Sequence, residues 1–176
     1  MTPEKSKNVT TDEMNLVVKY AKLCIREMAK KEYELRRRGI GSRIEPVTVI
    51  DLQACCRVRV KYRGQRSYGS FYGIKIDIKP LRNACGAFYE YNAYNDDPVI
   101  GGSEACGLTY TPKGHLLMTV AHEVSHYLQH QCGPHTRWLR DTYRKPHGHG
   151  FQSIYRKLRS QVVNPTMLCP REKYDG

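Results

Sequence analysis

The stretch "TVAHEVSHYLQHQC" spans residues 119–132 and carries a His-Glu-x-x-His pattern, from His122 to His126, among apolar residues at helical spacing. This spacing predicts an amphipathic helix that ends near Cys132. The apolar positions are Leu116, Leu117, Val120, Ala121, Val124 and Leu128. Residues four apart on a helix lie one above the other, about 6 Å along its axis, so both imidazoles can reach one ion. Glu123 is then placed beside the attacking water as a general base.

A catalytic zinc ion needs a third protein ligand and an open position for water. Downstream of His126 the carboxylates are only Asp141, Glu172 and Asp175, and none of them lies in the predicted last helix. His130 lies about 12 Å from His122 along the helix axis, so it cannot share the ion and is expected as a surface or neighbouring side chain. The candidates for the third ligand are therefore His135, His147 and His149, and Cys132 is a less favoured candidate.

The stretch "KPHGHGFQSIYRKLR" (residues 145–159) starts the predicted last helix, which Pro165 is expected to end. Its apolar residues at helical spacing are Phe151, Ile154, Tyr155, Leu158 and Val162. If these residues pack beside the first histidine helix, His147 at the start of the last helix comes to the ion. We therefore favour His147 as the third ligand, with His149 as the second choice or a hydrogen-bonding neighbour.

The rest of the chain predicts an α+β domain. A capping-box pattern at Thr10 and Glu13, followed by apolar residues at helical spacing, predicts one long helix over residues 11–38. After this helix, apolar and polar residues alternate with a period of two, which predicts β-strands. The Gly/Ser-containing segment 63–70 is expected as a hairpin turn between antiparallel strands. The expected strands cover residues 47–52, 56–62, 71–78 and 87–94. The order is helix, antiparallel strands, helix, helix.

Composition limits the class of protein. The 176 residues suffice for one well-buried domain. The 29 Lys+Arg against 17 Asp+Glu give a net charge of +12, which favours a polyanionic partner such as nucleic acid. Seven cysteines without a CxxC pair indicate reduced thiols, and neither a signal peptide nor a membrane span is apparent. We expect an intracellular protein, cytoplasmic or associated with nucleoid or nucleus, without membrane contact. The sequence leaves the oligomeric state open, and we favour a monomer.

Several cations could contact nucleic acid. Arg57, Arg59 and Lys61 alternate with apolar residues, so they share one strand face, which is either plainly solvated or a phosphate-contacting surface. Trp138 lies among cations, and it either stacks on an unpaired base or covers the junction between the last two helices. The candidate nucleic-acid-binding residues are Arg57, Arg59, Lys61, Arg137, Trp138, Arg140, Arg144, Lys145, Arg156 and Lys157.

The two histidine motifs resemble those of the SprT-like (Spartan-type) zinc metalloproteases. The matching residues are His122, Glu123 and His126, then His147-Gly148-His149-Gly150-Phe151 at the start of a helix. The hairpin region "RSYGSFYGIKIDIKPLRN" (66–83) is also similar to that family. The resemblance covers roughly residues 10–163 and is specific at the two histidine motifs.

The resemblance implies a zincin-like single domain at residues 10–165, with a flexible N-terminus at 1–9 and a tail at 166–176. This domain would have an N-terminal helix, a small antiparallel or mixed sheet, the HExxH helix and a C-terminal helix. The tail lacks the CxxC zinc ribbon of some members, which leaves DNA recognition to the basic surface of the domain.

The resemblance also implies an activity. One Zn²⁺ would be bound by His122, His126 and His147, with Glu123 activating water. The substrates would be proteins bound or crosslinked to DNA, with DNA, single-stranded DNA included, as partner and activator.

Two other functions remain open. One is a zinc peptidase whose protein substrate is not linked to DNA, and the other is a non-catalytic nucleic-acid-binding protein with structural zinc. The intact Glu123 favours an enzyme, because a structural zinc site usually closes its fourth position with Cys or His and needs no such glutamate.

Overall fold

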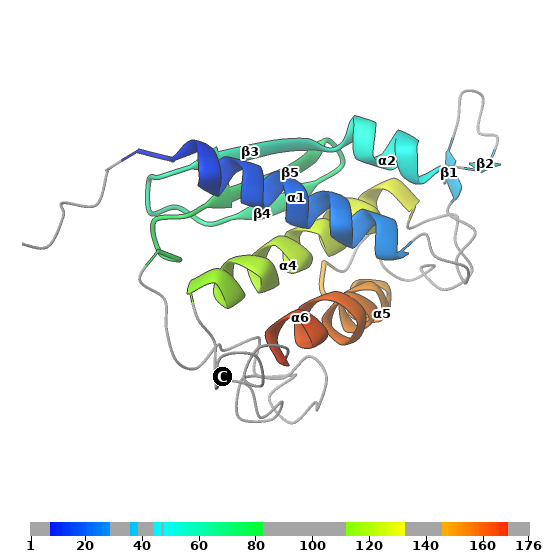
Figure 1. Cartoon of the computed structure of the whole chain (residues 1–176). Helices are drawn as coiled ribbons and strands as arrows, with labels where there is room; N and C mark the ends of the chain where they lie inside the picture. Colours follow the sequence, from blue (N-terminus) through cyan, green and yellow to red (C-terminus); the bar gives the residue numbers. More distant parts are fainter. Residues whose placement is uncertain are drawn as a thin grey trace, which may run out of the picture.

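The computed structural model describes residues 8–28, 36–38, 44–46, 48–82, 112–132 and 146–168. In this part of the chain helices lie on one side of a small mixed sheet, an α+β arrangement (Figure 1). The expected strand at 87–94 lies outside the described residues, as do His135, Arg137, Trp138, Arg140, Arg144 and Lys145. None of the described helices combines the length and apolar character needed to cross a membrane.

The main sheet has the strand order β3-β5-β4, formed by β3 (Arg57–Lys61), β4 (Tyr68–Ser70) and β5 (Gly73–Asp77). β4 and β5 form the antiparallel hairpin, whereas β3 pairs with β5 in parallel. The predicted antiparallel pairing of residues 56–62 with 71–78 is therefore wrong. Residues 62–67 carry the chain across the end of β5 and into β4, so β3 and β5 run in the same direction.

Asp77 shapes this crossing segment. Its buried carboxylate accepts hydrogen bonds of 2.9–3.2 Å from the backbone N–H groups of Arg63, Gly64 and Gln65, and one of 3.1 Å from that of Lys79. Burial alone raises the pKa of Asp77, but these hydrogen bonds outweigh it and hold the pKa below its usual value. The segment is thus folded around an internal negative charge.

Residues expected as the first strand instead form helix α2 (Val49–Cys55). Thr48 and Asp51 make a reciprocal capping box, with hydrogen bonds of 3.1 and 3.2 Å between side chains and backbone N–H groups. The hydroxyl of Tyr127 also donates to the carbonyl of buried Leu52 at 2.8 Å. Capping and burial outweigh the strand preference of the β-branched residues in this segment.

Helix α1 (Thr11–Met28) starts at the predicted capping box but ends earlier than predicted. Residues near the expected helix end form strand β1 (Arg36–Arg38), which pairs antiparallel with β2 (Ile44–Pro46). Met28 is buried, whereas the sequence beyond it is dominated by charged residues that offer little apolar surface to bury.

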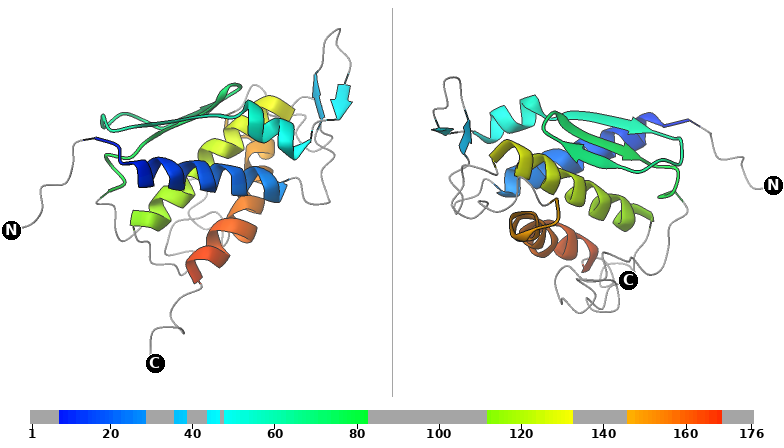
Figure 2. Two further views of the ribbon diagram at one scale, coloured as in Figure 1. Left: turned by 45° about the horizontal axis from the view of Figure 1, so that its top comes forward. Right: turned by 180° about the vertical axis from the view of Figure 1, so that it is seen from behind.

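Helix α4 (Pro112–Cys132) lies between the sheet and the last helix, with α1 beside it (Figure 2). Its bounds confirm the helix predicted through residue 132. The buried apolar residues of α4 pack with those of α1, the sheet and the last helix into one core.

The last helix begins with α5 (His149–Leu158), passes through a π-helical turn, η4 (Arg159–Val163), and continues as α6 (Asn164–Leu168). The prediction that Pro165 ends the helix is wrong. A proline lacks the N–H for a helical hydrogen bond, and its ring clashes with the carbonyl four residues earlier. The π turn before Pro165 shifts the hydrogen bond of Asn164 to the carbonyl of Arg159, five residues back, so the helix continues.

An ion pair ties the start of α1 to the segment after β5. The guanidinium of Arg82 contacts the carboxylate of Glu13 at 2.6 and 2.8 Å and lowers the pKa of Glu13. Glu13→Gln keeps the capping box but removes the charge, so it should lower the free energy of unfolding at pH 7 by about 1 kcal/mol. The folded pKa lies below the ordinary value of 4.5, so the difference should shrink as pH falls below 4.5.

Urea unfolding at several pH values measures this difference. Asp12→Asn, in the same exposed helical turn, is the matched control and should show a smaller change. A Glu13→Gln effect that is the same at pH 7 and well below pH 4.5 contradicts the ion-pair explanation.

Candidate metal centre

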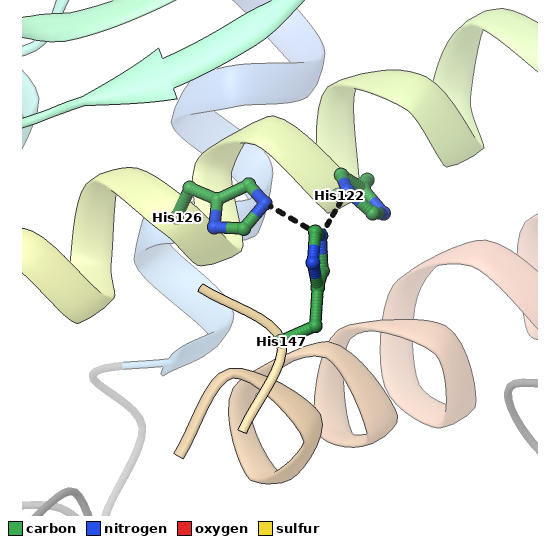
Figure 3. A group of neighbouring side chains, drawn as sticks. All are labelled: His122, His126 and His147. Carbon is green, nitrogen blue, oxygen red and sulfur yellow. Dashed lines mark hydrogen bonds between the residues drawn. The ribbon is translucent and has the colours of Figure 1, made fainter. Parts of the chain in front are cut away.

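His122 and His126 project from α4 toward His147, which lies in the turn before α5 (Figure 3). The Nε2 atom of His147 is 3.1 Å from Nε2 of His126 and 3.3 Å from Nε2 of His122. Ligand atoms of all three residues lie within 4.8 Å of one another. Zinc–nitrogen bonds of about 2.0–2.1 Å in a tetrahedron place neighbouring nitrogens about 3.3 Å apart, so this spacing suits one zinc ion.

The chemistry of the three rings also fits a cation. A neutral imidazole nitrogen either carries a proton or offers a lone pair, yet Nε2 of His147 faces two other Nε2 atoms. It therefore cannot accept a hydrogen bond from one neighbour and donate one to the other, so it forms a normal hydrogen bond with only one of them. A cation that receives a lone pair from each ring suits all three nitrogens.

Phe151, at the start of α5, supports all three rings. Its side chain is fully buried and stacks on His126 with ring centroids 4.4 Å apart. It also makes edge contacts of 4.8 Å with His122 and His147. The apolar contact predicted between the two helices is therefore also the contact that brings His147 to the site.

Two glutamine side chains orient the histidines, and the sequence analysis missed both. Oε1 of Gln129 lies 3.4 Å from Nδ1 of His126, which suits an Nδ1–H donor and leaves Nε2 for the metal. The side-chain amide of Gln152 donates to the carbonyl of His147 at 3.0 Å. The only signal for Gln129 was its position three residues after His126, on the same helix face.

Burial favours the neutral, metal-binding form of the most enclosed histidine. Burial lowers the pKa of His126 to about 3, and the charges of His122 and His147 act in the same direction. Neutral imidazole is the form that binds metal ions.

The three histidines open onto a cleft of about 930 Å³. Glu123, 7% exposed, lies in its wall together with His122 and His126, and the facing wall includes residues 64–69. A cleft of this size can hold a segment of a larger substrate. The site therefore combines a histidine cluster that could hold a metal ion, a carboxylate and open space.

The other predicted site residues are spread over several elements. His130 lines the same cleft, and burial lowers its pKa. His149 is exposed and lines a separate hollow with Arg156 and Lys157 on α5. Arg57 and Arg59 are exposed on β3, whereas Lys61 is partly buried, and Lys157 is mostly buried.

Comparisons of the chain with protein-family models, with curated proteins and with solved structures found no match. The resemblance to SprT-like metalloproteases therefore depends on the residues of this chain alone, chiefly on the two histidine motifs and less on the hairpin region 66–83.

Removing His147 should remove most of the zinc affinity. Loss of a partner that only orients a ligand reduces metal affinity about 10- to 100-fold, and loss of a ligand should exceed that. His147→Ala should therefore lose bound zinc on dialysis and lose the rise in Tm that zinc gives the wild type. His149→Ala, two residues away and exposed, is the control that should keep both. Equal zinc content in the two variants contradicts the assignment.

Gly69 permits the close approach of β4 to α4. A Cβ atom at this position would lie 2.1 Å from the carbonyl oxygen of Glu123 and 2.7 Å from Cβ of His126. Gly69→Ala must therefore displace the strand or the helix, and should lower stability by about 1–3 kcal/mol and weaken zinc binding. Denaturant unfolding and zinc titration measure both effects. Ser70→Ala removes only the two 3.3 Å hydrogen bonds of its hydroxyl within the β4–β5 turn, so it is the matched control for zinc binding. An equal loss of zinc affinity in the two variants contradicts the close-packing explanation.

Proposed function

We propose that this chain is a zinc metallopeptidase of the SprT-like type, with a zincin-like fold, that hydrolyses proteins bound or crosslinked to DNA. The observation that carries the proposal is the convergence of His122, His126 and His147 beside Glu123 in an open cleft. Metal-assisted hydrolysis needs this combination of ligands, base and substrate space.

Each part of the site has a role in peptide hydrolysis. Zinc, when bound, supplies a Lewis acid that polarises the scissile carbonyl and lowers the pKa of water toward about 7. His122, His126 and His147 would hold the ion. Glu123 takes the proton of the attacking water and passes it to the leaving amine. The buried rings of Phe151 and Tyr155, which contact His122, keep water from that side of the site.

The strand beside the cleft supports a peptide as substrate. β4 is at the edge of the three-stranded sheet, and its residues Tyr68 and Gly69 line the cleft. An edge strand presents backbone N–H and C=O groups that can pair with an extended chain. An extended segment of a protein substrate would thus lie within reach of Glu123.

A structural zinc site is less well supported. Such a site usually has a fourth Cys or His ligand. Within the described ranges, the metal-binding cluster contains three histidines and no fourth candidate ligand. A cluster of three histidines that borders the cleft favours catalysis.

The link to DNA rests on charge. The net charge of +12 and the exposed Arg57 and Arg59 favour a polyanionic partner. A peptidase with an unlinked protein substrate is the second candidate, and it differs from the first in its response to DNA.

Zinc-dependent cleavage of casein, or of the chain itself, tests the enzyme. Glu123→Gln should keep the metal, because all three ligands remain, but lower the rate of cleavage about 100- to 10,000-fold through loss of the base. The assay is run with and without zinc, and with and without single-stranded DNA, on chains whose zinc content has been measured.

Three outcomes separate the candidates. Absence of cleavage by the wild type under every condition contradicts the peptidase. Cleavage that is indifferent to DNA and to salt contradicts the DNA-linked substrate and favours the second candidate. Cleavage by Glu123→Gln at the wild-type rate contradicts the role of Glu123.

A further inference from the structure

The face of the main sheet that points away from α4 carries cations and tyrosines. Side chains alternate between the two faces of a strand, and Ile74 and Ile76 of β5 are buried in the core. Views from two sides place α1 and α4 on one side of the sheet (Figure 2). The alternate residues therefore point the other way. They include Arg57, Arg59, Tyr68 and Lys75, which together with Tyr72 of the β4–β5 turn we call the cation–tyrosine face. Lys61 and the fully buried Asp77 continue the same rows at the far end of the sheet.

The strand register aligns this face across all three strands. Arg59 is paired with Lys75, and Lys75 is paired with Tyr68. The Lys75 ammonium lies 4.7 Å from the centre of the Tyr68 ring. In the next row Gly73 has no side chain, and a hollow of about 160 Å³ lies among Arg57, Tyr68 and Tyr72.

Both tyrosines are exposed but are carried on fixed backbone. Tyr68 is 48% exposed and Tyr72 is 69% exposed. The carbonyl of Tyr72 accepts a hydrogen bond of 3.0 Å from the backbone N–H of Arg57. The side-chain amide of Gln131, in α4, donates to the carbonyl of Phe71 at 2.6 Å. The turn is therefore attached both to β3 and to α4, which reduces the entropy lost when its rings bind a partner.

Charge and aromatic exposure together favour one class of partner. The residues lining the hollow include three cations, Arg57, Arg59 and Lys75, and no carboxylate. Cations alone would suit any polyanion, including an acidic protein. Exposed rings between cations suit single-stranded nucleic acid, because its unpaired bases stack on aromatic rings while its phosphates meet the cations.

We propose that the cation–tyrosine face binds single-stranded nucleic acid. Tyr68 and Tyr72 stack on bases, and the three cations contact phosphates. Tyr68 also lines the cleft that holds the metal-binding cluster, so a bound strand would pass its rim. That link rests on the proposed peptidase function, whereas the binding itself does not.

Fluorescence anisotropy with a labelled oligothymidylate of about a dozen nucleotides tests the proposal. All measurements use the full chain with Glu123→Gln, so that cleavage plays no part. Tyr72→Ser should weaken binding about tenfold through loss of one stacked base, and Tyr72→Phe should bind like the parent. Arg57→Gln with Arg59→Gln should reduce the slope of log affinity against log salt by about 1.4, because each single-strand phosphate contact contributes about 0.7.

Controls identify the surface and the partner. Lys19→Gln with Lys22→Gln removes the same charge from exposed positions of α1 and should leave the slope unchanged. A duplex of equal length should bind more weakly than the single strand and should not respond to Tyr72→Ser. Poly-glutamate should not displace the oligonucleotide at equal charge concentration.

Several results would overturn the proposal: no oligonucleotide binding by the parent, equal losses in the β3 and α1 double variants, no effect of Tyr72→Ser, equal binding of the duplex, or displacement by poly-glutamate. Failure of the peptidase is a separate result. A chain that binds the oligonucleotide through this face but never cleaves protein contradicts only the proposed enzyme. A chain that cleaves protein but shows one of the overturning results contradicts only this surface.

Discussion

The packing of Phe151 against three imidazole rings is the contact on which the candidate metal centre depends. Two of its histidines come from α4 and the third comes from a turn 21 residues after His126. No local property of either segment brings them together. Phe151 is fully buried, and the apolar surface that α4 and α5 bury around it sets the position of His147. The ligand geometry is thus a by-product of core formation.

The opposite side of α4 is held by a different kind of contact. There β4 approaches the helix backbone at Gly69, at a distance that admits no larger residue. The helix turn that carries Glu123 is therefore held between an aromatic ring on one side and a strand backbone on the other. Such a turn can keep the proposed base and two of the proposed ligands in fixed relative positions, as preorganised catalysis requires.

The parts of the fold that follow from local pattern were predictable. The spacing of apolar residues predicted α4 and its end at Cys132. The absence of carboxylates from the predicted last helix left histidine as the candidate third ligand, and the structure brings His147 to His122 and His126. The parallel pairing of β3 with β5 was not predictable, because it depends on Asp77 and a crossing segment distant in sequence.

Local signals also competed with one another in two segments. At Thr48 the capping box favours a helix, whereas the β-branched residues around it favour a strand. The segment forms helix α2 in place of the predicted strand. At Pro165 the proline predicted a helix end, but a π turn accommodated it. The face that each strand side chain takes in the sheet depends on the strand register, which only the folded chain specifies.

The internal charge of Asp77 has a consequence for how this chain can vary. Its carboxylate binds main-chain N–H groups, so the path of the segment at the cleft does not depend on the side chain of Arg66 and depends little on that of Gln65, which accepts one exposed hydrogen bond of 3.4 Å from Lys75. Gly64, at a φ of 77°, and Ser67, whose hydroxyl accepts from the Asp77 N–H, are the positions where identity matters. Mutation at Gln65 and Arg66 can thus change what the cleft presents to a substrate while the rim keeps its shape, which separates the evolution of selectivity from the maintenance of the fold.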